Sequence, residues 1–170
     1  MTLTRRSFLA LVAVLVAPWG RDTVQAQAPA PITVFVVRHA ERESSEGDSP
    51  LSTIGTARAE RLAAMLTDAG ITHVFSTEFV RTRHTVAPLA TRAGLTPTVV
   101  PGRDMNALIA QLQTLPPGSR ALVAGHSNTV AAIVSRLSGK TVPALTEADY
   151  DRLYAVTVAG GAGEVVLLHF

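Results

Sequence analysis

Apolar residues along the chain form two kinds of segment that alternate: short continuous runs, and longer segments in which they recur at helical spacing. Short, nearly continuous apolar runs are typical of strands that are buried on both faces of a parallel sheet. Such runs cover 32–37 and 121–124, and shorter ones at 72–76 and 98–100 predict two further strands. Strands that alternate with helical segments in this way predict an α/β domain, here a three-layer α/β/α sandwich with a mostly parallel central sheet.

Helices are predicted between these strands, where apolar residues recur at helical spacing. The first begins with a cap at Ser52 and ends at Gly70. The last is expected to begin with a cap at Ser127 or Asn128. The other helices and the two closing strands are predicted at 81–93, 105–115, 154–158 and 164–170, and residues 139–151 indicate only a loop or a short helix.

The first 26 residues have the three-part pattern of an export signal. A charged start with Arg5 and Arg6 precedes an apolar run at 8–17, and small residues follow at 24–26. The paired arginines resemble a twin-arginine signal. The apolar run is too short for a bilayer, which needs about 20 residues. We therefore predict an export signal at 1–26, a linker at 27–31 and a domain at 32–170, in a periplasmic or secreted protein without stable membrane insertion.

Charge and composition narrow the possible partners. The formal net charge is +2, and without the three arginines and one aspartate of the leader it is zero. A neutral domain with 5% aromatic residues has neither a basic surface nor a stacking platform, so nucleic acid is not an expected partner. The chain has no cysteine, which leaves chemistry to histidine, arginine and carboxylates.

Two histidines directly follow the two clearest buried strands. His39 comes after the strand at 32–37, and His126 comes after the strand at 121–124. Because ligands bind at the carboxyl ends of strands in open α/β sheets, both imidazoles are expected in one crevice. A neutral imidazole can attack phosphorus, and arginines can bind the phosphoryl oxygens. Arg38 and Arg81 are the candidate arginines, which predicts a small phosphorylated substrate.

Several separated motifs resemble the histidine phosphatase superfamily, in particular its phosphoglycerate mutase-like branch. The motifs are Val37-Arg38-His39-Ala40-Glu41, with alanine where the family has glycine, Leu51-Ser52-x-x-Gly55, the stretch 76–86 with Arg81-Thr82-Arg83-His84-Thr85, and Ala124-Gly125-His126-Ser127-Asn128. The resemblance extends over about residues 32–170. Several motifs in the right order are far more specific than any one alone.

The resemblance implies a role for each matching residue. His39 would be the nucleophile, Arg38, Arg81 and His126 would hold the phosphoryl group, with Asn128 beside them, and neither metal nor cofactor would be needed. The family's general acid would be Asp104, in the loop before the third helix. Glu78 and Glu41 are the next candidates. The other branch has an aspartate directly after the second histidine, where this chain has Ser127.

Other interpretations of these residues stay open at this point. Asp104 could simply cap a helix. His39, Glu41, His84 and His126 could form a metal site of a metal-dependent hydrolase, although the close spacing typical of such sites is missing. A phosphate-binding module without turnover and a phosphoglycerate mutase-type phosphotransferase are the remaining alternatives. A mutase would need a cytoplasmic pool of bisphosphorylated sugar acid, so the predicted export favours a phosphatase.

Overall fold

Strands and helices alternate through most of the chain. The structure is a computed structural model that describes residues 28–159 and 162–170. The elements are β1 (Ile32–Arg38), α1 (Thr53–Met65), a short 3-10 helix (Thr67–Ala69), β2 (His73–Ser76), α2 (Val80–Ala93), β3 (Thr98–Val99), α3 (Met105–Gln113), β4 (Arg120–Gly125), α4 (Ser127–Ser138), β5 (Arg152–Ala159) and β6 (Ala162–His169).

The sheet has six strands in the order β3-β2-β4-β1-β5-β6. The four strands from β3 to β1 are parallel, whereas β5 runs antiparallel to β1, and β6 runs antiparallel to β5. In the register of β1 and β4, Arg38 lies opposite Gly125. The residues that follow these two strands, His39 and His126, are therefore placed next to each other.

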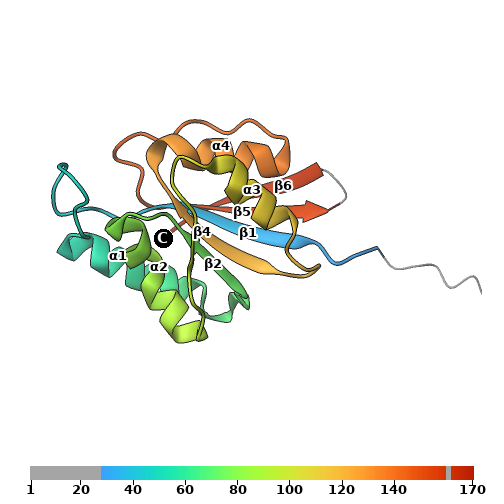
Figure 1. Ribbon diagram of the computed structural model, residues 1–170, viewed down its shortest axis with the longest axis horizontal. Helices are drawn as coiled ribbons and strands as arrows, with labels where there is room; N and C mark the ends of the chain where they lie inside the picture. Colours follow the sequence, from blue (N-terminus) through green and yellow to red (C-terminus); the bar gives the residue numbers. More distant parts are fainter. Residues whose placement is uncertain (1–27, 160–161) are drawn as a thin grey trace, which may run out of the picture.

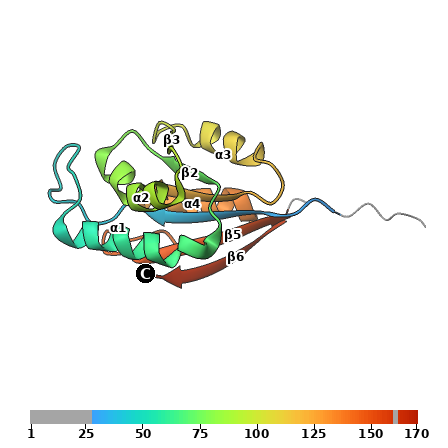
Figure 2. The ribbon, with the colours of Figure 1, turned by 90° about the horizontal axis from the view of Figure 1, so that it is seen from below.

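Helices cover both faces of the sheet, with α1 and α2 on one and α3 and α4 on the other (Figures 1 and 2). Two hydrophobic cores result. Val36 of β1 packs in the core beneath α3 and α4, whereas its neighbour Val37 packs in the core beneath α1 and α2. Successive side chains of a strand point to opposite faces, so a strand between two helical layers is apolar at consecutive positions.

This architecture confirms the predicted α/β class with helices on both faces of a mostly parallel sheet. One helix start differs from the prediction. The cap of α4 is His126, which precedes both predicted cap residues, Ser127 and Asn128. The backbone of His126 is extended, its side chain accepts a hydrogen bond from the Thr129 amide, and its own amide donates to Thr129 Oγ1 at 2.9 Å. Residues 139–151 contain no helix; they form a loop with a turn at 147–148.

The predicted export signal and most of the predicted linker lie outside the described residues. Within 28–159 and 162–170, no helix is long and apolar enough to cross a membrane.

Candidate active site

The carboxyl edge of the sheet carries a polar cavity of about 300 Å³. The amide of His39 donates to the Gly125 carbonyl at 2.9 Å, which ties the end of β1 to the end of β4. The rings of His39 and His126 are 5.4 Å apart, edge to face. The structure thus brings together five of the six predicted site residues. The lining comprises Arg38, His39, Arg42, Phe79, Arg81, Gly102, Arg103, His126, Ser127, Asn128, Thr129 and Glu147.

The hydrogen bond of His39 determines where its proton lies. Its Nδ1 is 2.8 Å from the Ala40 carbonyl oxygen, which can only accept, so Nδ1 carries the proton. In the neutral ring the lone pair is then on Nε2. Burial, with a smaller contribution from the positive charges of Arg38 and Arg81, lowers the pKa of His39 to about 4. His39 is therefore a neutral imidazole at pH 7, with the lone pair of Nε2 available.

His126 is also neutral, and it is held from two sides. Burial, followed by the charge of Arg81, lowers its pKa to about 4. One ring nitrogen accepts the Thr129 amide at the start of α4, and Nε2 lies 3.2 Å from Thr77 Oγ1. Thr77 Oγ1 in turn lies 2.7 Å from Thr82 Oγ1. This chain of hydrogen bonds fixes the ring beside His39.

Arg38 is buried, with 2% of its surface exposed, and is surrounded by residues 146–150. Its Nη1 donates to the carbonyls of Thr146 and Glu147 at 3.0 and 2.9 Å. Its Nη2 donates to the Glu147 carboxylate at 2.6 Å and to Tyr150 Oη at 3.3 Å. The guanidinium carbon lies 4.0 Å from the centre of the Tyr150 ring. Arg38 therefore has a fixed orientation.

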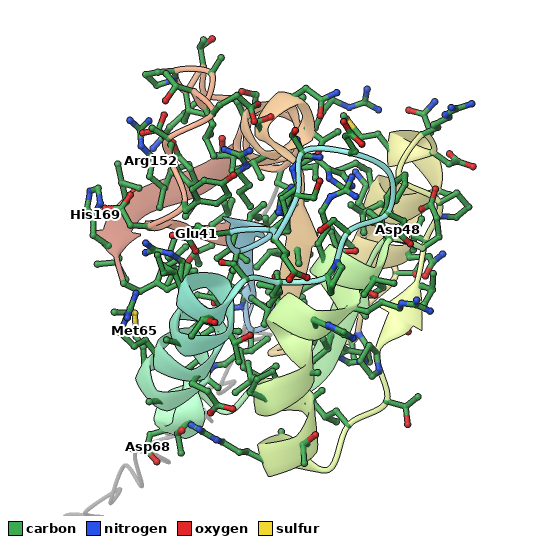
Figure 3. All side chains as sticks on the ribbon, turned by 90° about the vertical axis from the view of Figure 1, so that its left-hand side faces the viewer. Glu41, Asp48, Met65, Asp68, Arg152 and His169 are labelled. Carbon is green, nitrogen blue, oxygen red and sulfur yellow. The ribbon has the colours of Figure 1, made fainter. Side chains whose placement is uncertain are left out.

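Arg81 has far fewer contacts. Its guanidinium carbon lies 4.3 Å from the centre of the Phe79 ring, and its Nη1 lies 3.6 Å from the Asp48 carboxylate, beyond hydrogen-bond distance. Asp48 Oδ1 also accepts the Val80 amide at 2.9 Å and so caps α2. Figure 3, which faces the end of the sheet, shows Asp48 on the loop between β1 and α1. Burial and the neighbouring Arg42 lower the pKa of Arg81, although it stays a cation.

Three buried nitrogens of these two arginines have no hydrogen-bond partner among the described residues: Arg38 Nε, Arg81 Nε and Arg81 Nη1. Both residues line the cavity. A buried guanidinium donor without a partner loses its hydration without compensation, so such groups are rare unless a ligand completes them. These three donors predict that the cavity binds an anion.

Two residues of the recognised motifs have structural roles that support the site. Thr85 Oγ1 accepts the Ala40 amide at 2.9 Å and donates to the Arg81 carbonyl at 2.7 Å, which connects the turn after β1 to α2. Gly55 lies against the backbone of Glu41, and a Cβ there would overlap the Glu41 carbonyl oxygen. A threonine and a glycine are therefore needed at these positions to hold the turn that carries His39.

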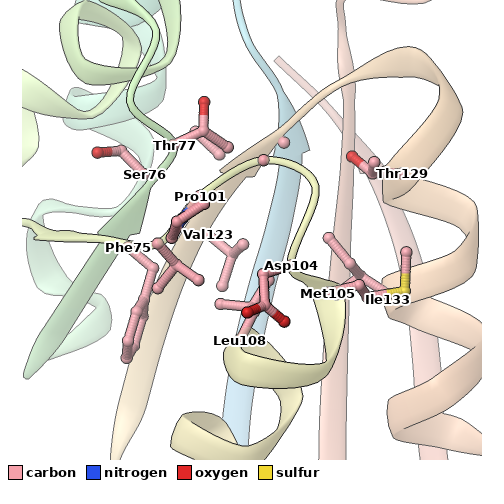
Figure 4. Close-up of a pocket in the computed structure, with 14 residues that line it drawn as sticks. Phe75, Ser76, Thr77, Pro101, Asp104, Met105, Leu108, Val123, Thr129 and Ile133 are labelled. Carbon is pink, nitrogen blue, oxygen red and sulfur yellow. The ribbon is translucent and has the colours of Figure 1, made fainter.

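The three predicted candidates for the general acid lie in different surroundings. Asp104 caps α3, since its Oδ1 accepts the Ala107 amide at 2.9 Å, and it lines a neighbouring, mainly apolar pocket (Figure 4). Glu78 accepts the Gly102 amide at 2.7 Å, at the wall between the two pockets. Glu41 forms an ion pair with Arg58 at 2.7 Å. None of the three carboxylates lines the cavity of His39 and His126, and the assignment of Asp104 stays a prediction.

The residues of the alternative metal site are not gathered around one point. Glu41 pairs with Arg58, and His84 lines a separate pocket beside Leu51 and Pro88. Among the described residues, no group of three or more His, Cys, Asp or Glu side chains is close enough to hold a metal ion.

The charged lining residues Arg42, Arg103 and Glu147 were not predicted, and neither was Tyr150, which contacts Arg38. Arg42 lies three residues after His39, and its proximity to that motif was the available signal. Arg103 lies in the loop before α3, directly before Asp104. Glu147 and Tyr150 lie in the stretch 139–151, whose pattern indicates no element, and so the sequence carried no signal for them.

The fold and the site together define an α/β protein with a neutral imidazole beside a cavity that four arginines line. Comparison with known proteins shows which family the chain resembles. The pattern of the histidine phosphatase superfamily (branch 1) matches residues 34–104. The predicted resemblance to this superfamily is thereby confirmed, and the matched stretch contains Arg38, His39 and Arg81.

One curated relative is a probable phosphoglycerate mutase GpmB of Yersinia pestis (strain Pestoides F). It is 35% identical over 83 residues, which cover 44% of this chain and 39% of the relative. The chain therefore matches about two fifths of the length of this relative.

Solved structures share the fold over most of the chain. The protein histidine phosphatase SixA, in complex with tungstate, has a TM-score of 0.68 and 24% identity, and the match covers 81% of this chain and 96% of SixA. A putative alpha-ribazole-5'-P phosphatase from Escherichia coli has a TM-score of 0.66 and 17% identity, covering 82% and 96%.

Proposed function

We propose that this protein hydrolyses phosphate monoesters through a phosphohistidine intermediate on His39. The observation that carries the proposal is the set of unpartnered donors on Arg38 and Arg81, in the same cavity as the free Nε2 of His39. A phosphoryl group spreads negative charge over its oxygens, which is what such donors complete. The family supports a phosphatase, and mutases also belong to it.

The geometry supports a reaction in two displacements. Arg38 and Arg81 bind the phosphoryl oxygens, and His39 Nε2 attacks phosphorus while the bond to the ester oxygen breaks. Water then attacks the phosphohistidine, and the electron pair of the P–N bond returns to Nε2. His126 is neutral, so it adds no charge to the site, and its Nε2 proton donates to a phosphoryl oxygen in place of Thr77 Oγ1, which lies 3.2 Å away in the free protein. Asn128 lines the cavity at the start of α4, where the helix amides favour an anion.

Hydrolysis of p-nitrophenyl phosphate by the purified protein tests the proposal. The wild type is expected to turn over in the presence of a chelator, and denatured samples quenched during turnover should carry phosphate on His39. His39→Ala should lose both turnover and the label. Turnover that the chelator removes would favour a metal-dependent hydrolase. Phosphate binding without turnover of any ester would favour a binding module.

A mutase-type transfer is separated from hydrolysis by following the phosphoryl group. The curated relative is called a probable phosphoglycerate mutase, which makes this the second candidate. A phosphatase releases inorganic phosphate in proportion to the ester consumed. Isomerised phosphoglycerate in place of inorganic phosphate would contradict hydrolysis as the main reaction.

We further propose that the protein is exported to the periplasm or secreted, with removal of residues 1–26. The proposal rests on the charged start, the apolar run and the small residues at 24–26. The test is expression in a bacterium with an intact twin-arginine route and in a mutant without it. Periplasmic protein that begins near Gln27 is expected only in the former. Cytoplasmic protein with an intact start in both strains would contradict export.

A further inference from the structure

The cavity contains one carboxylate among its described lining residues, and it belongs to Glu147. This residue lies in the loop before β5 rather than in any of the recognised motifs. The other charged side chains of the lining are the cations Arg38, Arg42, Arg81 and Arg103. A proton donor must reach the leaving oxygen before its pKa matters, and Glu147 is the carboxylate that meets this condition.

The position of the Glu147 carboxylate is fixed at both oxygens. Its Oε2 accepts from Arg38 Nη2 at 2.6 Å, and its Oε1 accepts from Ser127 Oγ at 2.7 Å. It therefore bridges the end of β1 and the first residue of α4. The side chain is nevertheless 74% exposed, so a molecule that enters the cavity from solvent can reach it.

The backbone around Glu147 is held as firmly. The Thr146 amide donates to the Asp149 carboxylate at 2.6 Å, and Asp149 forms an ion pair with Arg152 at 2.7 Å. Arg152 begins β5, so the loop is tied to the sheet. A carboxylate on such a support keeps its place when a ligand binds.

We propose that Glu147 is the group that gives a proton to the leaving oxygen and takes one from the attacking water. The proposal rests on the phosphohistidine reaction proposed above. In the first step His39 Nε2 bonds to phosphorus, the P–O bond to the leaving group breaks, and the leaving oxygen takes the proton of the Glu147 carboxyl. In the second step water bonds to phosphorus, its proton returns to Glu147, and the P–N bond breaks.

The proton of the first step arrives with the substrate. Hydrogen bonds from Ser127 and Arg38 lower the pKa of Glu147, so the carboxylate is ionised in the free protein at pH 7. An ester that binds as the monoanion brings one proton and also a second anion to Arg38. The like charge raises the pKa of Glu147, and the proton moves to its carboxylate.

Two esters with different leaving groups test this role. Nitrophenolate leaves without help, whereas the alkoxide of glycerol 2-phosphate must be protonated. For Glu147→Gln we expect kcat/KM to fall by about 10² or more with glycerol 2-phosphate and by less than about fivefold with p-nitrophenyl phosphate. Glu147→Asp should recover part of the loss with glycerol 2-phosphate. The matched control is Glu164→Gln, an exposed position on β6.

Phosphate binding separates proton transfer from a role in placing Arg38. Glu147→Gln removes a negative charge beside the anion, so its affinity for inorganic phosphate in calorimetry should be equal to that of the wild type or higher. An equal fall of kcat/KM with both esters, together with weaker phosphate binding, would overturn the proposal in favour of a positioning residue.

Asp104→Asn is measured beside these variants, because asparagine keeps the helix cap. A loss confined to glycerol 2-phosphate in Asp104→Asn instead of Glu147→Gln would overturn the proposal and favour Asp104.

The proposed function fails separately: a wild type that turns over neither ester and carries no label on His39 contradicts the phosphatase itself. A wild type that does both, with Glu147→Gln unchanged on both esters, contradicts only the role of Glu147.

Discussion

Arg38 and Arg81 line one cavity and are held in opposite ways. All four terminal N–H groups of Arg38 are engaged by residues 146–150, and only its Nε lacks a partner. Arg81 has two unpartnered nitrogens and a carboxylate only at 3.6 Å. The guanidinium of Arg38 is therefore oriented by the protein itself, whereas that of Arg81 has few protein partners. Under the proposed function, this leaves the orientation of Arg81 to the bound phosphoryl group.

Substitution of each arginine by glutamine tests this difference most strongly. Arg81→Gln removes two unpartnered donors and a charge, so we expect kcat/KM to fall by about 10²–10³. Its melting temperature should stay equal or rise, since an unpaired buried cation is lost. Arg38→Gln should lose activity and also stability, because the loop 146–150 loses its central partner. Exposed Arg83→Gln is the control. Equal melting temperatures for the Arg38 and Arg81 variants would contradict this difference.

The pKa values of the two histidines depend to different degrees on the charge of Arg81. Both have a pKa of about 4, but Arg81 is the second cause for His126 and a minor one for His39. Histidine titration by NMR should therefore show a larger upward shift for His126 than for His39 in Arg81→Gln. A larger shift for His39 would contradict the arrangement.

Stability should also depend on pH through these two histidines. The unfolded chain takes up protons near pH 6.5, and the folded chain only near 4, so the unfolded state binds more protons between these values. The stabilisation is complete above about pH 6.5 and is lost as the pH falls towards 4. Urea unfolding at pH 7 and at pH 4.5 measures this, and His39→Asn should have a weaker pH dependence than the wild type. An unchanged slope would show that His39 is not buried in its neutral form.

Tyr150 is one of the residues that fix the orientation of Arg38. Tyr150→Leu removes the ring beside the Arg38 guanidinium, an interaction of about 0.5–2 kcal/mol. We expect kcat/KM to fall by roughly five- to tenfold, within this range of free energy. Tyr150→Phe keeps the ring and loses only the 3.3 Å hydrogen bond, so its effect should be smaller. Equal effects would mean that the hydroxyl group, and not the ring, holds Arg38.

Substitution of Asp48, whose carboxylate lies near Arg81, is expected to have the smallest effect, a change in phosphate affinity. Asp48→Asn keeps a cap for α2 and removes the negative charge near Arg81. Exposed pairs contribute about 0–1 kcal/mol, so phosphate binding should become tighter by less than roughly fivefold. Calorimetry with inorganic phosphate measures this. Weaker binding in this variant would show that Asp48 orients Arg81 for its ligand.

The same comparison explains which parts were predictable from sequence. His39 and His126 follow apolar runs that only a buried strand accounts for, so the position of both at one sheet edge follows from pattern alone. The surroundings of Arg38 cannot be predicted from the pattern, because its partners lie 108 to 112 residues further along the chain. Residues 146–150 form no regular element, and no periodic pattern marks them. Their position depends on tertiary contacts with a buried cation.

The carboxylates show a second limit of sequence reasoning. Asp104 precedes a helix, and an aspartate at this position is typical both of a cap and of a loop that carries an acid. The structure shows the cap, whereas Glu147, with no motif around it, lies in the cavity. The cap of α4 was displaced by one residue for a related reason, since histidine is not a usual cap and accepts this position only through its bond with Thr129.

The reversal of direction at β5 has a consequence for where active-site residues originate. A parallel strand such as β1 or β4 delivers to the carboxyl edge the residues that follow it. Because β5 runs antiparallel to β1, with Leu153 opposite Val37, it delivers the residues that precede it. The stretch 146–151 therefore reaches the same edge as His39 and His126. One reversed strand gives the carboxyl edge of the sheet a second source of side chains, whose sequence can vary without any change to the strand-end motifs.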